Sequence, residues 1–201
     1  MGKKGYFIVI EGLDGSGKTT QANLLAERLS SSYKVVCTAE PSQGKVGKFI
    51  RECCLYENKR LPVAVEALLF AADRMEHLEN EVKPAVDEGK LVVCDRYIYS
   101  SLAYQGSAGL DLSWIKQINS CALNPDYAVF VDVPPERVIE RLQRRKSVME
   151  TLEIQRKVRE IYLKYVANGE LVRVDGDKSK LQVADDLFST VSGFLTRADR
   201  V

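Results

Sequence analysis

A glycine-rich segment near the N-terminus contains residues that could hold a phosphate chain. Residues 9–21 read VIEGLDGSGKTTQ, and Gly12, Gly17, Lys18 and Thr19 match the spacing G-x-x-x-x-G-K-[ST]. Glycines let the backbone curl so that successive N–H groups point into one concavity at the start of a helix, where an anion is favoured. Lys18 can then reach the β- and γ-phosphates, and the Thr19 hydroxyl can bind Mg²⁺.

The same spacing could arise by accident in a glycine-rich turn. Its surroundings favour a phosphate loop, because residues 6–10 are β-branched and aromatic, as in a buried parallel strand, and residues 20–29 have helical spacing. We therefore predict a nucleoside triphosphate site. It consists of the consecutive residues Gly12, Leu13, Asp14, Gly15, Ser16, Gly17, Lys18, Thr19 and Thr20.

A second segment, VVCDRYIYSSLAYQG at 92–106, could bind another substrate. Asp95 follows an apolar strand-like run, a position from which a carboxylate can reach Mg²⁺ directly or through water. Arg96 offers a bidentate fork to an acceptor phosphate. The alternative is a structural Asp–Arg pair at the end of a strand. On a helix, Ser100 and Tyr104 would share one face, and Ser101 and Gln105 another.

The elements that must position these residues alternate between strand and helix. This alternation predicts an α/β fold of three layers, with a five-stranded parallel sheet covered by helices on both faces. The carboxyl ends of the strands, with the loops that follow them, would then lie along one edge. Strands are expected at 6–10, 34–38, 91–94, 127–133 and 171–174, and helices at about 18–30, 46–55, 63–88, 112–123, 134–145, 149–167 and 180–196.

Composition and charge narrow the class of protein. The chain of 201 residues is 45% hydrophobic and 28% charged, and no linker divides it, so we expect a single domain over 1–201. A net charge of +1 argues against nucleic acid and anionic membrane as partners. No run approaches the roughly 20 apolar residues of a membrane helix. Five cysteines without zinc spacing favour reduced thiols in the cytoplasm, and the single histidine, His77, excludes histidine-based triads.

A phosphate loop alone does not distinguish an ATPase, a GTPase and a kinase. The chain lacks the N-K-x-D motif with which a GTPase reads guanine, and a translocating or regulatory ATPase usually needs a larger chain or further domains. The remaining class is a small phosphotransferase, which must hold a second substrate opposite the γ-phosphate.

The combined motifs resemble those of thymidylate kinase, a P-loop nucleoside-monophosphate kinase family. The phosphate loop is generic, but F-x-x-x-R, D-R-Y and A-Y-Q-G together are specific. The resemblance spans nearly the whole chain. The matching segments are EGLDG (11–15), GKTT (17–20), EP (40–41), LFAADR (69–74), DRY (95–97), AYQG (103–106) and DVPPE (132–136), together with Arg141.

This resemblance implies a role for each matching side chain at a dTMP site. Phe70 would stack on thymine, Arg74 would donate to its O4, and Ser101 or Gln105 would touch the base. Tyr104 would stand where a ribose 2′-hydroxyl would clash. Arg96 would grip the acceptor phosphate, Asp14 would hold the 3′-hydroxyl or lie near that phosphate, and Thr19 and Asp95 would serve the metal.

Other uses of these residues remain open. Phe70 could belong to a helix core, Tyr104 to a core or an interface, and Arg74 to a surface pair with Asp73 or Glu79. The resemblance also has departures. Ala39 stands where many relatives have an arginine, and residues 42–45 lack the arginine of eukaryotic members, which Lys45 could replace.

A basic segment, ERLQRRKSVMETLE at 140–153, could form a lid over about 141–150. It could instead be a solvated helix end, where cations suit the dipole. Thymidylate kinases supply a charge-neutralising arginine either in the phosphate loop after its aspartate or in the lid. Gly15 follows Asp14 here, so the resemblance assigns that role to Arg144 or Arg145. Arg141 would lie against the adenine or the donor phosphates.

The expected activity is therefore phosphorylation of dTMP to dTDP by Mg²⁺·ATP, through direct in-line transfer. Family resemblance further implies a homodimer packed through helices. Two alternatives stay open: a kinase for another pyrimidine or deoxynucleoside monophosphate such as dUMP, and a nucleotide-binding switch or scaffold without catalysis.

Overall fold

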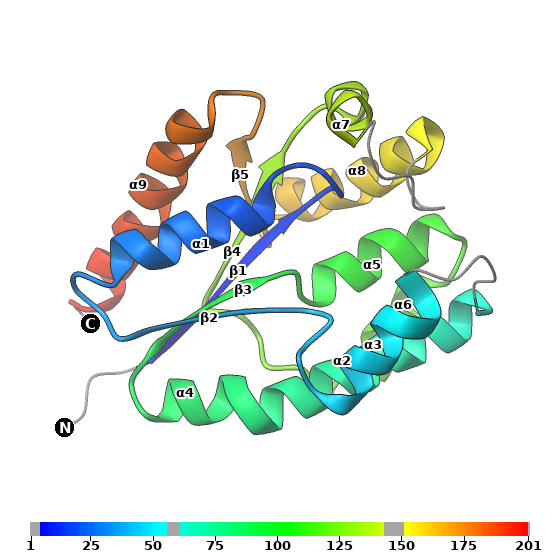
Figure 1. Cartoon of the computed structure of the whole chain (residues 1–201), viewed down its shortest axis with the longest axis horizontal. Helices are drawn as coiled ribbons and strands as arrows, with labels where there is room; N and C mark the ends of the chain where they lie inside the picture. The colour runs from blue at the N-terminus through cyan, green and yellow to red at the C-terminus, as the bar shows by residue number, and fades with distance from the viewer. Residues whose placement is uncertain (1–4, 56–60, 143–150, 201) are drawn as a thin grey trace.

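Five parallel strands form one sheet in the computed structural model, which describes residues 5–55, 61–142 and 151–200. Their order is β2–β3–β1–β4–β5, so the strand that leads into the phosphate loop lies in the centre. Figure 1 shows the sheet between two layers of helices. The strands are β1 (Tyr6–Gly12), β2 (Val35–Ala39), β3 (Leu91–Asp95), β4 (Tyr127–Asp132) and β5 (Val172–Asp175). The predicted three-layer α/β fold is confirmed.

Nine α-helices occur in the described parts of the chain. Most lie close to their predicted positions. Residues 100–105 lie within α5, so the side chains expected to share a helix face do lie on a helix. They are α1 (Lys18–Leu29), α2 (Lys45–Ile50), α3 (Val63–His77), α4 (Lys83–Asp87), α5 (Ile98–Ser107), α6 (Leu112–Ile118), α7 (Pro135–Leu142), α8 (Leu152–Ala167) and α9 (Lys180–Ala198), with π-helical turns at Arg51–Leu55 and Leu78–Val82.

Two helix boundaries differ from the prediction. The helix expected over 112–123 ends at Ile118, because Asn119 caps it and returns its side-chain amide to the Ile115 carbonyl at 2.8 Å. The helix expected over 63–88 is α3 followed by a π-helical turn and α4. The end of the helix expected over 134–145 lies in residues 143–150, outside the described residues.

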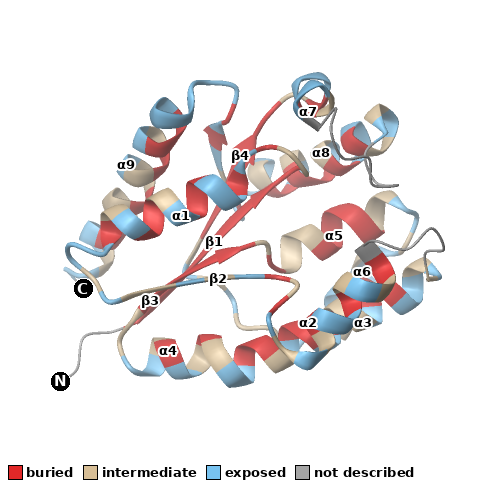
Figure 2. Ribbon diagram, in the orientation of Figure 1, coloured by how far each residue is buried: buried red, intermediate tan, exposed pale blue. Residues whose placement is uncertain are grey.

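The two faces of the sheet have separate apolar cores, because side chains alternate along each strand. On β1, Phe7 and Val9 pack toward α4, α5 and α8, whereas Ile8 and Ile10 pack toward α1 and α9. Figure 2 shows the central strands buried along their length and the surrounding helices buried on one side only. Since both faces are covered, chemistry is confined to the carboxyl edge of the strands.

Candidate active site

The phosphate loop connects β1 directly to α1. Gly15 and Gly17 have φ angles of 84° and 87°, a left-handed conformation that favours glycine. Lys18 is the first residue of α1, and its Nζ donates to the Leu13 carbonyl at 3.2 Å while remaining 6% exposed. Burial and then the charge of Arg96 lower the pKa of the Lys18 ammonium. The loop therefore has the backbone of an anion cradle with a buried cation inside it.

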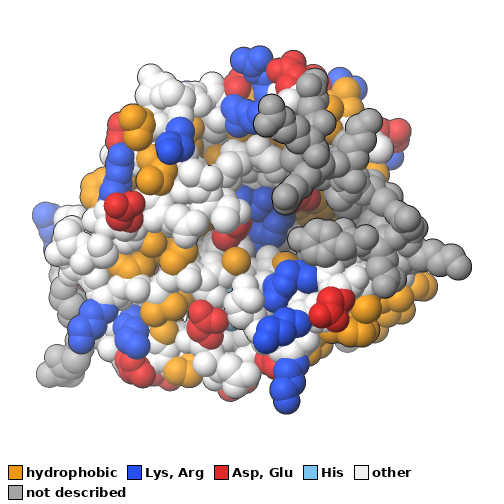
Figure 3. Space-filling view, viewed as in Figure 1, with side chains coloured by type: hydrophobic (Ala, Val, Ile, Leu, Met, Phe, Trp, Pro, Cys, Tyr) orange, Lys and Arg blue, Asp and Glu red, His pale blue; other side chains and the backbone are white. Residues whose placement is uncertain are grey.

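Asp14 brings the two expected phosphate-binding cations together. Its Oδ1 lies 3.7 Å from Lys18 Nζ and forms an ion pair with Arg96 Nη2. Burial alone would raise the pKa of Asp14, but the charges of Arg96 and Lys18 lower it to about 2. Lys18 and Arg96 thus converge on one carboxylate. Figure 3 shows several Lys and Arg side chains near the middle of the molecule in that view.

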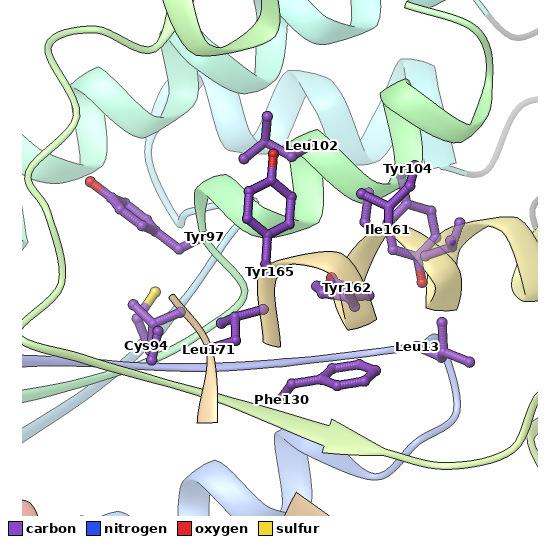
Figure 4. Close-up of a cluster of buried hydrophobic side chains, with 14 of the residues drawn as sticks. Leu13, Cys94, Tyr97, Leu102, Tyr104, Phe130, Ile161, Tyr162, Tyr165 and Leu171 are labelled. Atoms are coloured by element: carbon purple, nitrogen blue, oxygen red, sulfur yellow. The ribbon is translucent and has the colours of Figure 1, made fainter. Parts of the chain in front are cut away.

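Arg96 is held in an unusual backbone conformation. Its φ is 73°, and among the described residues it is the only non-glycine with a positive φ. Such strain tends to mark functional positions. Its Nη1 donates to Ser100 Oγ at 2.9 Å, and its guanidinium lies 5.1 Å from the centre of the Tyr104 ring. The Tyr104 hydroxyl accepts the Asp14 N–H at 2.9 Å, and Figure 4 shows this hydroxyl directed toward the loop that carries Leu13.

Thr19 and Asp95 lie together beside the phosphate loop. The Thr19 hydroxyl donates to Asp95 Oδ2, while Asp95 Oδ1 is buried and has no hydrogen-bond partner. Hydroxyl and carboxylate oxygens are the ligands that Mg²⁺ prefers, and Mg²⁺ usually keeps water and substrate phosphates as its other ligands. The described residues contain no cluster of three or more His, Cys, Asp or Glu side chains suited to a metal. The donor set fits Mg²⁺ bound together with a nucleotide.

Asp14, Lys18, Asp95 and Arg96, here called the phosphate corner, adjoin a second group of residues around Arg74. Arg74 is 2% exposed and donates to Glu40 Oε2 at 2.8 Å and Ser101 Oγ at 3.1 Å, and it also bonds to Asn119. We call Glu40, Arg74, Ser101 and Asn119 the base pocket, after the contact with a base that the resemblance predicts for Arg74 and Ser101.

The structure excludes the surface pairs considered for Arg74. Asp73 accepts the Ser42 backbone N–H and hydroxyl at 2.8 and 2.6 Å, and Glu79 pairs with Lys83. The Arg74 guanidinium instead lies 5.1 Å from the centre of the Tyr97 ring. The alternative of a surface ion pair for Arg74 is therefore wrong, and the arginine is part of a buried network.

The comparisons with known proteins agree with this geometry. A family model described as thymidylate kinase matches residues 10–187. A probable thymidylate kinase of Pyrococcus horikoshii is 50% identical over 169 residues, covering 80% of this chain and 82% of that protein. A probable thymidylate kinase of Pyrococcus abyssi is 46% identical, covering 94% and 96%. A thymidylate kinase of Thermoanaerobacter sp. is 36% identical, covering 96% and 100%.

The chain belongs to the thymidylate kinase family. It is therefore an enzyme, a nucleoside-monophosphate kinase that phosphorylates dTMP with ATP. The expected family, fold and activity are confirmed, and neither a kinase for another pyrimidine or deoxynucleoside monophosphate nor a silent switch or scaffold is favoured.

The structure places the remaining predicted residues as follows. Phe70 lies half-buried on α3, and Gln105 on α5 is 3% exposed. Gln105 Oε1 and Arg74 Nε are buried without a hydrogen-bond partner, as expected for polar atoms that a ligand would satisfy. Arg141 is exposed at the end of α7, where its Nη2 lies 3.4 Å from Asp177. Arg144 and Arg145 lie outside the described residues.

Residues that sequence reasoning missed connect these groups. Asn119 was expected inside a helix, but it ends α6 and contacts Arg74. Glu40 was seen only as part of a motif, yet it is the buried counter-ion of Arg74. Glu11 was given no role, although it is the only charged residue of β1. A charged residue within an apolar strand was a visible signal that it serves the site.

Proposed function

We propose that the phosphate corner transfers the γ-phosphoryl group of ATP in line to dTMP, giving dTDP and ADP. An oxygen of the dTMP phosphate forms the new bond to phosphorus as the bond to the ADP oxygen breaks. Lys18 and Arg96 would stabilise charge on the two phosphates, and Asp14 would hold the 3′-hydroxyl or lie near the acceptor phosphate. The observation that carries this proposal is the shared contact of both cations with Asp14.

The donor nucleotide would occupy the loop 12–20, with Arg141 against the adenine or the donor phosphates. Thr19 and Asp95 would hold Mg²⁺, which neutralises phosphate charge when it is bound. The support is the unpaired, buried Asp95 Oδ1 beside the Thr19 hydroxyl.

The acceptor base would occupy the space beside the base pocket. Phe70 would stack on thymine, Arg74 would donate to its O4, and Ser101 or Gln105 would contact the base. Tyr104 would disfavour a ribose 2′-hydroxyl. Support comes from the buried polar atoms of Arg74 and Gln105 that have no protein partner. An aromatic platform with a few polar groups at its edge is suited to a pyrimidine.

A lid over about 141–150, within a single domain spanning 1–201, would complete the site. Arg144 or Arg145 would neutralise the transferred group, because Gly15 leaves the phosphate loop without an arginine after Asp14. Closing such a lid would exclude water, which would otherwise compete as the acceptor.

A substrate panel tests the proposed activity. We expect ADP release to be fastest with dTMP when dTMP, dUMP, ribothymidine monophosphate, dCMP and dAMP are compared at equal concentration. One methyl group contributes only about 1 kcal/mol of burial, so dUMP should rank second. Faster turnover of a purine, or ATP binding without transfer to any monophosphate, would contradict the proposal.

We also propose a homodimer in which α3 packs against a second copy of the chain. Val65, Leu68 and Met75 are exposed at helical spacing on α3, and exposed Phe49 comes from neighbouring α2. One apolar patch that meets itself across a two-fold axis suits an isologous interface. Light scattering should show a dimer that Leu68→Glu dissociates. Leu181→Glu, at an exposed leucine of α9, should leave it intact, and a monomeric parent would contradict the proposal.

The helices, the net charge and the cysteines bear on where this enzyme is located and what it contacts. Among the described residues no helix combines the length and apolarity needed to cross a bilayer. The net charge of +1 provides no basic field for nucleic acid. We propose a cytoplasmic location, which the odd number of cysteines and the absence of zinc-site spacing in the sequence support.

A further inference from the structure

Glu11 is a fully buried carboxylate in the centre of the molecule. It lies on β1 directly before the phosphate loop and is 0% exposed. Its Oε1 accepts the backbone N–H groups of Tyr97 and Ser100 at 2.9 and 3.1 Å. Its Oε2 accepts the hydroxyls of Ser100 and Tyr162 at 2.6 and 2.9 Å. A buried charge requires such partners, and four donors suit an ionised carboxylate, which has only acceptors.

The Ser100 hydroxyl links this carboxylate to Arg96. Because it donates its proton to Glu11, its oxygen is left as an acceptor for Arg96 Nη1 at 2.9 Å. The resulting order is guanidinium to hydroxyl to carboxylate, so the ionised Glu11 determines which way the Ser100 hydroxyl points. Burial raises the pKa of Glu11, while the hydrogen bond from Ser100 and the charge of Arg96 oppose that rise.

The backbone of Arg96 is fixed by the same strand. Its N–H donates to the carbonyl of Ile10, the residue before Glu11, at 3.0 Å. The left-handed φ of 73° is sustained where surrounding contacts over-determine the conformation. Two adjacent residues of β1 therefore hold Arg96: Ile10 binds its backbone N–H directly, and Glu11 contacts its side chain through Ser100.

Tyr162 connects a third element to Glu11. It comes from α8, the helix that follows residues 143–150, and its ring stacks on Phe130 of β4 with centroids 4.7 Å apart. Figure 4 shows the Tyr162 and Phe130 rings beside one another. One carboxylate thus joins the central strand, the start of α5 and α8.

We propose that Glu11 is a positioning residue for recognition of the acceptor phosphate: it acts through Ser100 to orient the Arg96 guanidinium. The inference depends on the proposed contact of Arg96 with that phosphate. Glu11 does not itself touch a substrate. A purely structural role, in which it only anchors the first turn of α5, would affect all acceptors alike.

Thymidine separates the two roles because it has the base and sugar of dTMP but lacks the phosphate. Calorimetric binding of both ligands should be measured for the parent, Glu11→Gln and Ser100→Ala. We expect each variant to weaken dTMP about tenfold, as when a hydrogen bond to a charged group is lost, and to leave thymidine binding unchanged. The double variant should lose no more than the stronger single variant, because both act through one chain of contacts.

One further variant tests the assumption about Arg96 on which this experiment depends. Arg96→Ala should remove most of the preference for dTMP over thymidine; if it does not, the proposed role of Arg96 is wrong. If Arg96→Ala behaves as expected but Glu11→Gln and Ser100→Ala keep the parental preference, or weaken both ligands equally, only the positioning role is overturned. Ser100→Ala decides alone if Glu11→Gln does not fold.

Asp126→Asn is the matched control. Asp126 also accepts a backbone N–H from β1, that of Phe7 at 2.8 Å, but at the opposite end of the strand. Its substitution should change neither ligand's affinity.

Discussion

Arg96 and Arg74 are expected to contact the same substrate, yet the protein holds them in contrasting ways. Arg96 has a side chain 17% exposed, a left-handed backbone, and a partner, Asp14, that is itself partly exposed. Arg74 and its partner Glu40 have side chains only 2% and 3% exposed, and Ser101 and Asn119 also bond to the arginine.

The difference suits the two halves of the substrate. A phosphate brings its own charge, so a bound phosphate could take the place of the partly exposed Asp14 as the partner of Arg96. A neutral base cannot neutralise an arginine, so the base pocket contains a permanent counter-ion. Substitutions in the phosphate corner should therefore act mainly on rate, and those in the base pocket mainly on folding.

The strongest test of the phosphate corner is Lys18→Ala. We expect turnover to fall about 10³-fold, as when a donor to developing charge is removed, with a near-parental urea midpoint. Coupled ADP release and urea unfolding measure the two quantities. Lys83→Ala, at an exposed pair with Glu79, is the control and should leave both unchanged. Equal losses of rate and stability in Lys18→Ala would blur the contrast between the regions.

The base pocket should respond in the opposite sense. Arg74→Met removes the guanidinium from buried Glu40, which then faces His77 Nδ1 at 3.3 Å, so we expect a loss of about 3–5 kcal/mol in unfolding free energy. Arg28→Ala, which breaks an exposed pair with Asp185, should cost less than about 1 kcal/mol. Similar urea curves for the two variants would show that the buried Arg74–Glu40 pair contributes no more to the unfolding free energy than an exposed pair.

Asp95→Asn should sharpen the comparison within the phosphate corner. We expect the Mg²⁺ concentration for half-maximal rate to rise about tenfold, because one anionic oxygen ligand is lost. The KM for dTMP should stay constant, since no base-pocket residue is changed. Asp87→Asn, at an exposed carboxylate of α4, serves as the control. An unchanged Mg²⁺ dependence would remove Asp95 from the metal site.

The smallest expected effect is a pH dependence of stability from Asp14. Its pKa in the folded protein is lowered from 3.8 to about 2, so the ionised group stabilises the fold above about pH 4. That contribution is lost as the pH falls through the folded pKa. The unfolding free energy of the parent should exceed that of Asp14→Asn near neutral pH, and the difference should shrink toward pH 2. A constant difference would mean that Asp14 gains little from Lys18 and Arg96.

The sequence predicted features that depend on short spacing. The phosphate loop, the five strands and the helical faces of residues 100–105 all follow from neighbouring residues, and the structure agrees. The ion-pair partner of Arg74 could not be predicted from spacing. Glu40 lies 34 positions away, and the adjacent Asp73 was an equal candidate. Sequence spacing identified the arginine but not the network that buries it.

Boundaries and connecting residues were harder to predict for a related reason. The hydrophobic periodicity predicts that the helix starting at 112 runs to residue 123. In the structure α6 ends at Ile118, where Asn119 caps it and also contacts Arg74. The role of Glu11 depends on Ser100 and Tyr162, which are 89 and 151 positions away. Such contacts form only when distant segments meet at the edge of the folded sheet, so no single segment of the sequence predicts them.

The register between β1 and β3 limits where residues can be inserted into or deleted from this chain. Ile10 lies opposite Asp95, and Tyr6 opposite Leu91, so each main-chain step along β3 is matched to one along β1. An extra residue in the turn at 88–90 leaves this matching intact. An extra residue within 92–94 turns the Asp95 carboxylate to the opposite face of the sheet. Over evolutionary time, length variation should therefore collect at the amino ends of the strands, while the spacing that leads to the carboxylate stays constant.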